Sequence, residues 1–132
     1  MTLRRSFASL AAVVAACLAL PADAADRMRA GQWVGTTITA GRTFPNSSCI
    51  SQADADAMNG DAKSIKAFLE KAIPPEICKL SDFKVNGGTV VYTATCGSAP
   101  ARVVTTSYHG DSSAGGDSIG TKSEAKRTGA CK

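Results

Sequence analysis

The amino-acid sequence predicts a mainly β (α+β) domain: an antiparallel β meander or half-barrel with a short two-helix insert and two disulfides. Several segments rich in Val, Ile, Thr and Tyr are separated by glycine-containing turns, as is typical of antiparallel strands. Helical periodicity is confined to one stretch, between Cys49 and Cys78. Once a predicted leader is removed, four cysteines remain, and an even number in a small exported domain favours two disulfides.

The first 24 residues have the features of a secretory signal peptide. Arg4 and Arg5 precede an apolar run over 7–20, and small residues at 22–24 provide a cleavage site. This run is too short and too rich in alanine for a membrane-spanning helix. We therefore expect a signal peptide at 1–24 and a single domain at 25–132, exported to the periplasm or secreted. The alternative is a membrane lipoprotein, because residues 14–17 resemble a processing box that would lipidate Cys17.

Composition excludes one large class of function. The formal net charge is +4 and aromatic residues make up 5% of the chain. This balance is too weak for phosphate neutralisation, and the aromatics are too scattered for base stacking. We therefore expect no nucleic-acid partner.

The segment from Cys78 to Cys96 predicts a β-hairpin, with both cysteines equidistant from Gly87. The hairpin pairs Cys78 with Cys96, and elimination leaves Cys49 with Cys131. A two-residue loop at 86–87 would place Cys78 opposite Thr95, so we expect either a β-bulge between Leu80 and Asp82 or a three-residue loop at 86–88. No two cysteines have metal-ligand spacing and the chain has one histidine, so no metal site is predicted.

Before the first cysteine the sequence predicts a frayed start and two strands. Residues 26–29 are polar, and 31–39 read as the first strand. After a turn at 40–42, a short second strand is expected to break at Pro45, and 46–48 to form a loop.

Two helices are expected next. Ser51 caps a helix over 52–58 and Asp61 caps a second over 62–72. Ile65 and Phe68 lie on one face of the second helix, which should cover one face or end of the sheet.

After the hairpin, residues 101–108 predict a good strand and 109–112 a turn. Residues 113–121 are small and polar and contain another turn signal. Residues 122–128 predict a weak last strand whose lysines suit a solvent-facing edge.

The candidates for catalysis are His109, Asp111 and Ser112. A nucleophile needs a base held against it and oriented by a third group, but these residues are crowded into one turn, where side chains diverge. Turn formation explains them better, so no catalytic residue and no cofactor are predicted. Asp54 and Asp61 suit helix capping, because this stretch lacks the Gly and terminal Glu of a calcium loop.

Residues that could contact a ligand or partner are aromatic or basic. Trp33 in the first strand could belong to the core or line a pocket, and a basic cluster near the C-terminus could meet an anionic surface. The candidate contacts are Trp33, Tyr92, Tyr108, Lys122, Lys126 and Arg127.

Short motifs along the chain resemble the bacterial domain-of-unknown-function 3617 family of small exported proteins. The motifs are Gly31-Gln32-Trp33, Cys49-Ile50-Ser51 with Asp54, Cys78 with Ser81-Asp82-Phe83, a Val/Tyr-rich strand ending at Cys96, Tyr108-His109-Gly110-Asp111-Ser112, and Gly129-Ala130-Cys131. The resemblance implies an envelope-associated, mainly antiparallel β domain and supplies no activity. Only 18 residues separate Ser112 from Cys131, short for two full strands, so an incomplete sheet is expected there.

Together these observations predict a non-catalytic periplasmic or envelope protein that acts as a binding module. The expected partner is an envelope protein or a small apolar ligand held on the sheet. The alternatives are an interaction or inhibitor module acting through the edge strand at 122–127, and a hydrolase centred on His109. A membrane is involved only if Cys17 is lipidated.

Overall fold

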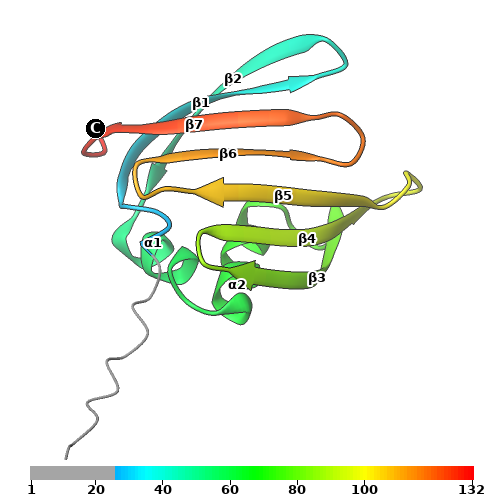
Figure 1. Cartoon of the computed structure of the whole chain (residues 1–132), viewed down its shortest axis with the longest axis horizontal. Coiled ribbons are helices and arrows are strands. Elements are labelled where there is room, and N and C mark those ends of the chain that lie inside the picture. The colour runs from blue at the N-terminus through cyan, green and yellow to red at the C-terminus, as the bar shows by residue number, and fades with distance from the viewer. Residues whose placement is uncertain (1–25) are drawn as a thin grey trace, which may run out of the picture.

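The computed structural model describes residues 26–132, so the predicted signal peptide and Cys17 lie outside the described residues. The elements are β1 (Gly31–Thr39), β2 (Arg42–Ile50), α1 (Gln52–Met58), α2 (Ala62–Ala72), β3 (Cys78–Asn86), β4 (Thr89–Cys96), β5 (Arg102–Tyr108), β6 (Ser112–Asp117) and β7 (Lys122–Gly129) (Figure 1).

The strands form one open seven-stranded sheet in the order β2-β1-β7-β6-β5-β4-β3. Every neighbouring pair is antiparallel. Strands β3 to β7 follow one another as a meander, and the β1–β2 hairpin joins the meander through β1 and β7. The mainly β fold with a helical insert is therefore confirmed, and the edges of the sheet are β2 and β3.

Both helices lie against one face of the sheet, at the end formed by β3 and β4 (Figure 1). We call this the inner face and its opposite the outer face. Met58 of α1 and Ile65 of α2 are fully buried, and they share the core with Leu80, Val90 and Trp33. Complete burial of such a side chain contributes about 1.5–3 kcal/mol. The region where the helices pack on the sheet therefore contains most of the hydrophobic stabilisation of the molecule.

The hairpin of β3 and β4 turns at Gly87 and Gly88, with Asn86 paired to Thr89. The register shifts between Ser81 and Lys84, where Asp82 adopts a positive φ of 56°. This bulge is the predicted one, displaced slightly toward the turn, and the three-residue loop is not formed. The shift brings Cys78 opposite Cys96, and Phe83 stacks on Tyr92 with ring centroids 5.2 Å apart.

Both predicted helix starts are confirmed. The Ser51 side chain accepts a hydrogen bond from the Asp54 backbone N–H at 3.1 Å. The Asp61 carboxylate accepts one from the Ser64 backbone N–H at 2.8 Å. Each cap satisfies a donor that the first turn of a helix leaves without a partner.

Strand β2 corrects the prediction of a short strand followed by a loop, because it continues through Pro45 to Ile50. Ala40 and Gly41 both have positive φ and make a two-residue turn, so Thr39 and Arg42 form the first hydrogen-bonded pair. Counting from this pair, the main chain of Pro45 faces away from β1. The missing N–H of Pro45 therefore removes no hydrogen bond from the sheet, which is why proline is tolerated in an edge strand.

The C-terminal third corrects two further predictions. Residues 112–117 form β6, where an incomplete sheet was expected, and 122–129 form β7, which lies between β1 and β6 and is not an edge strand. A short turn at 118–121 leaves room for both strands, so the sheet is complete. Hydrophobic periodicity did not predict β6, because its sequence, Ser-Ser-Ala-Gly-Gly-Asp, does not alternate between apolar and polar residues.

The segment before β1 is anchored, whereas the sequence predicted fraying. Arg27 is buried, and its guanidinium donates hydrogen bonds to the carbonyls of Met58 at 3.0 Å, Gly60 at 2.9 Å and Gly87 at 2.7 Å. Met28 lies in the core. Arg27 therefore connects the junction of the two helices to the turn of the β3–β4 hairpin.

Candidate functional site

The outer face of the sheet is uncovered. The registers place Val34, Thr36 and Ile38 of β1 beside Lys126, Glu124 and Lys122 of β7 on this face. Across β6 they are followed by Val103, Thr105 and Ser107 of β5. None of these residues is buried, and Val34, Ile38 and Val103 are 41%, 43% and 46% exposed. The outer face thus combines exposed apolar side chains with charged ones.

Shallow grooves run along this face beside β6 and β7. The outward positions of β6 are occupied by Ser112, Ala114 and Gly116, whose side chains are short or absent. The longer side chains of β5 rise beside this strand and enclose a groove of about 470 Å³. A second groove of about 200 Å³ lies between Val34 of β1 and Lys126 of β7.

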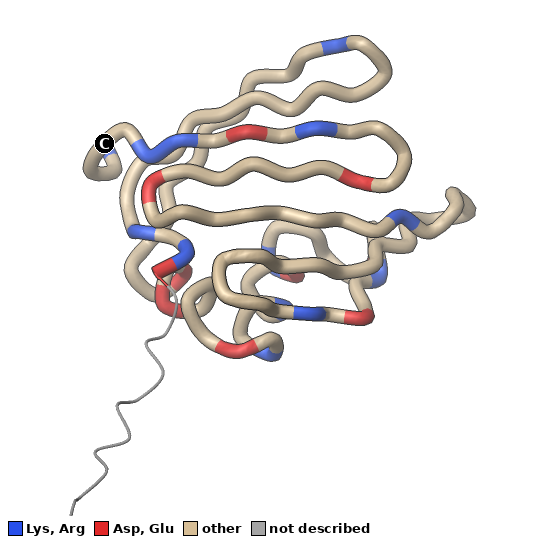
Figure 2. Tube along the Cα trace, in the orientation of Figure 1, with Lys and Arg blue, Asp and Glu red and all other residues tan. Residues whose placement is uncertain are grey.

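Strand β7 carries charged residues of both signs along its length (Figure 2), and its alternate positions belong to the outer face. Lys122 and Lys126 are both exposed there, with Glu124 between them. Alternate residues of a strand are roughly 7 Å apart, so the two ammonium groups can meet anionic groups spaced about twice that distance. The predicted contacts Lys122 and Lys126 are therefore on an accessible surface.

Two of the predicted aromatic contacts belong to the core. Trp33 is 3% exposed, and its indole N–H donates to the Arg29 carbonyl at 2.9 Å. Tyr92 is buried on the inner face beneath Phe83. Burial raises the pKa of Tyr92, an effect that the charge of Arg102 partly offsets. Neither side chain is presented to a ligand on the surface.

Tyr108 also faces inward, and it packs against the core from the end of β5. Burial raises the pKa of Tyr108 to about 12; the neighbouring Tyr92 adds to this shift, and a hydrogen bond with Thr106 opposes it. The Tyr108 side chain is therefore neutral under ordinary conditions and serves packing.

Arg127 is separated from the two lysines by the alternation of β7. It faces the inner side, and its Nε donates to the Ala30 carbonyl at 2.6 Å. The predicted basic cluster is thus divided between two faces of the sheet. Successive side chains of a strand point to opposite faces, so the sequence would have predicted this division of the basic cluster if the register of β7 had been known.

The turn at His109 links strands β5 and β6. The backbone N–H of His109 donates to the Ser112 carbonyl at 2.8 Å. The Asp111 carboxylate accepts a hydrogen bond from Arg29 at 2.8 Å, which connects this turn to the segment before β1. The carboxylate that a hydrolase would use to orient His109 is thus engaged by an arginine.

Both edges of the sheet carry features that discourage pairing with another strand. Edge strand β2 contains Pro45, whose main chain faces outward without an N–H. Edge strand β3 contains Lys79 and Lys84 and is bent by its bulge. Charged side chains, proline and bulges are the usual protections of exposed edges, so the faces are better binding surfaces than the edges.

Val34, Ile38 and Val103 were not among the predicted contacts. Their signal is in the sequence, because in each strand they alternate with positions that face inward. Which of two alternating sets faces solvent depends on where the helices pack, and local sequence does not specify it.

Within residues 26–132, no helix is long and apolar enough to cross a bilayer. Over the same range, no three His, Cys, Asp or Glu side chains are grouped as metal ligands would be.

The structure contains both disulfides with the predicted pairing, Cys49–Cys131 and Cys78–Cys96. Paired cysteines in a small domain indicate an oxidising, extracytoplasmic environment. Fold and cysteines together define a disulfide-bonded, mainly β extracytoplasmic protein. A family model described as protein of unknown function (DUF3617) matches residues 28–131, so the chain belongs to that family, as its motifs indicated. No curated protein and no solved structure gives a match.

Proposed function

We propose that this protein is a non-catalytic binding module of the bacterial envelope, exported by its signal peptide, and that its outer face binds a partner protein. The observation that carries the proposal is the uncovered outer face, on which Val34, Ile38 and Val103 are between 41% and 46% exposed. These apolar side chains are distributed over β1 and β5 among polar and charged ones, and such a mixed apolar and polar surface is typical of non-obligate protein interfaces.

The shape of this face favours a protein over a small apolar molecule. Pockets for small ligands are concave and bury most of the ligand surface. The grooves beside β6 and β7 are shallow and follow the strands, so a small apolar molecule, which depends on burial alone for its affinity, would keep much of its surface in water there. A protein surface could cover several grooves at once and bury the valine and isoleucine side chains together.

The positive charges of the outer face indicate what kind of partner surface would fit it. Lys122 and Lys126 are exposed beside the apolar residues of β1. An acidic rim on the partner would complement these lysines and speed association, and the effect would weaken with salt.

The test is capture of a partner from periplasmic extract, with the variant Val34→Lys compared with Ile77→Lys. Ile77 is 63% exposed and precedes β3, outside the outer face, so it is a matched control for a charge placed on an exposed apolar residue. We expect Val34→Lys to weaken capture at least tenfold and Ile77→Lys to leave it unchanged. Equal effects of the two variants would contradict the proposal.

Two further measurements address the alternatives. A small apolar ligand would be retained as an adduct in native mass spectrometry and lost in Val34→Lys without any protein partner, which would overturn the choice of a protein. Cell fractionation tests export: we expect a periplasmic chain that begins near Ala25, whereas a membrane-bound form modified at Cys17 would contradict this localisation.

A further inference from the structure

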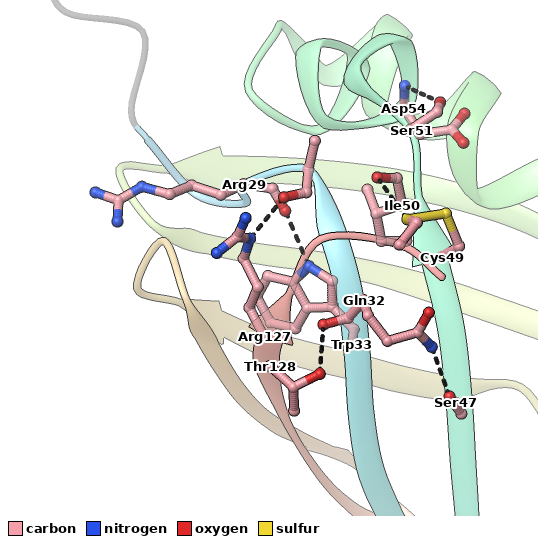
Figure 3. Close-up of a disulfide and its surroundings, with 12 residues drawn as sticks. Arg29, Gln32, Trp33, Ser47, Cys49, Ile50, Ser51, Asp54, Arg127 and Thr128 are labelled. Atoms are coloured by element: carbon pink, nitrogen blue, oxygen red, sulfur yellow. Dashed lines mark hydrogen bonds between the residues drawn. A yellow bond between two sulfur atoms is a disulfide. The ribbon is translucent and has the colours of Figure 1, made fainter.

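A second candidate site lies at the corner of the sheet where the Cys49–Cys131 disulfide closes the fold (Figure 3). Three segments meet there: the start of β1, the junction of β2 with α1, and the residues that follow β7. They border an open depression of about 440 Å³, which we call the corner pocket; its lining includes Gly31, Ile50, Gln52, Arg127 and Cys131.

Arg127 supplies the charge of the corner pocket. Its Nε is fixed by the Ala30 carbonyl at 2.6 Å, and no other hydrogen bond or ion pair engages its guanidinium within residues 26–132. Of the acidic groups on neighbouring elements, Asp111 is paired with Arg29 at 2.8 Å and Asp54 with Lys71 at 2.7 Å, while Asp56 accepts a hydrogen bond from Gln52 at 2.8 Å. Arg127 is therefore an oriented cation whose remaining N–H groups are free for an anion.

Gly31 makes room for this guanidinium. A Cβ at position 31 would lie 2.6 Å from the Arg127 Nε and 2.3 Å from the Gly129 carbonyl oxygen, both too close for any side chain. The φ of Gly31 is +141°, which residues with side chains rarely adopt. The glycine that opens β1 thus allows Arg127 to lie across the main chain at the pocket wall.

The rest of the wall is apolar or neutral. Ile50 is 8% exposed, and two alanines, Ser51 and Cys131 complete the lining. Gln52 contributes a neutral amide, held by the Asp56 carboxylate at 2.8 Å. A planar guanidinium beside an apolar wall fits a planar anion that is attached to a short apolar body.

We propose that the corner pocket binds a carboxylate carrying a short apolar group, with the carboxylate on Arg127 and the apolar group against Ile50. Two sources share this chemistry: a free monocarboxylate and the C-terminal carboxylate of a peptide. The inference is independent of the partner on the outer face, because the two surfaces are lined by different residues.

The test is titration of the isotope-labelled protein with hexanoate at constant ionic strength, followed by amide NMR shifts. We expect saturable shifts at Gly31, Ile50 and Arg127, and weaker binding of both inorganic phosphate and hexanol, which each lack one half of the ligand. Absence of saturable shifts at these residues, or equal binding of hexanol, would overturn the proposal.

Two variants test the role of the arginine. Arg127→Gln should weaken hexanoate binding at least tenfold, whereas Lys126→Gln, the next residue on the other face, should leave it unchanged. Because Arg127→Gln also removes the bond to Ala30, Gln52→Glu provides a second route: it places a negative charge in the wall from an exposed helix position and should weaken binding several-fold. Unchanged binding in Gln52→Glu together with Arg127→Gln would reject the site.

A short apolar peptide, compared as free acid and as C-terminal amide, separates the two sources. Tighter binding of the free acid than of hexanoate would indicate a protein C-terminus, and weaker binding would indicate a free monocarboxylate. Val34→Lys should leave hexanoate binding unchanged, so failure of either site can be recognised separately.

Discussion

The sheet has two halves with similar antiparallel pairing but different side chains. In the helix-packed half, β3 to β5, the inner face presents Leu80, Val90 and Tyr92 to the helices. In the open half, formed by β2, β1, β7 and β6, most inward positions beyond Trp33 are small, such as Gly115 and Ala125. One half therefore relies on hydrophobic burial, and the other on main-chain pairing.

The disulfides follow this division. Cys78–Cys96 lies within the helix-packed half, where strong packing already holds the chain. Cys49–Cys131 joins β2 to the segment after β7, the two neighbours of β1 in the sheet. A link across 82 residues restricts the unfolded chain more than one across 18, so in the chain-entropy model the open half receives the larger stabilisation. A covalent link there stabilises the open half without covering its surfaces.

The strongest test of this contrast is a pair of identical substitutions. Ile65→Ala removes a fully buried side chain from the helix-packed half, and we expect it to lower the free energy of unfolding by about 2–5 kcal/mol. Ile38→Ala removes an exposed side chain from the open half and should cost less than about 0.5 kcal/mol. Urea denaturation measures both; similar losses would show that the open half also depends on burial.

A second pair of variants probes how the N-terminal segment is attached to the helix-packed half. Arg27→Ala leaves three main-chain carbonyls without their charged donor, so we expect a loss of roughly 2–4 kcal/mol. Arg29→Ala removes only exposed ion pairs and should cost less than about 1 kcal/mol. Thermal unfolding followed by circular dichroism would compare them, and equal shifts in Tm would contradict the assigned role of Arg27.

The sequence predicted the helix-packed half in detail because local rules determine it. The caps at Ser51 and Asp61, the helical spacing of Ile65 and Phe68, and the cysteine-closed hairpin are all short-range patterns. Even the bulge follows from two local demands, a tight turn and facing cysteines.

The open half was harder to predict because its organisation depends on distant residues. β6 has no apolar alternation, and only its pairing with β5 and β7 makes it a strand. The lysines of β7 suggested an edge strand. In the structure β7 pairs with β1, which precedes it in the sequence by almost a hundred residues. The same long-range pairing decides which face each side chain occupies, so it placed Lys126 on the grooves and Arg127 in the corner pocket.

The smallest expected effect concerns Tyr108, at the boundary between the halves. Burial raises the pKa of Tyr108 to about 12, whereas an unfolded tyrosine titrates near 10. Between these values the unfolded chain releases a proton that the folded protein retains, so stability should decline as pH rises from about 10 toward 12. Tyr108→Phe should make this decline shallower without abolishing it, because burial also raises the pKa of Tyr92. Denaturation midpoints measured across this pH range in both proteins provide the test: an unchanged slope would mean that Tyr108 is accessible to solvent, and that the core ends before it reaches the open half.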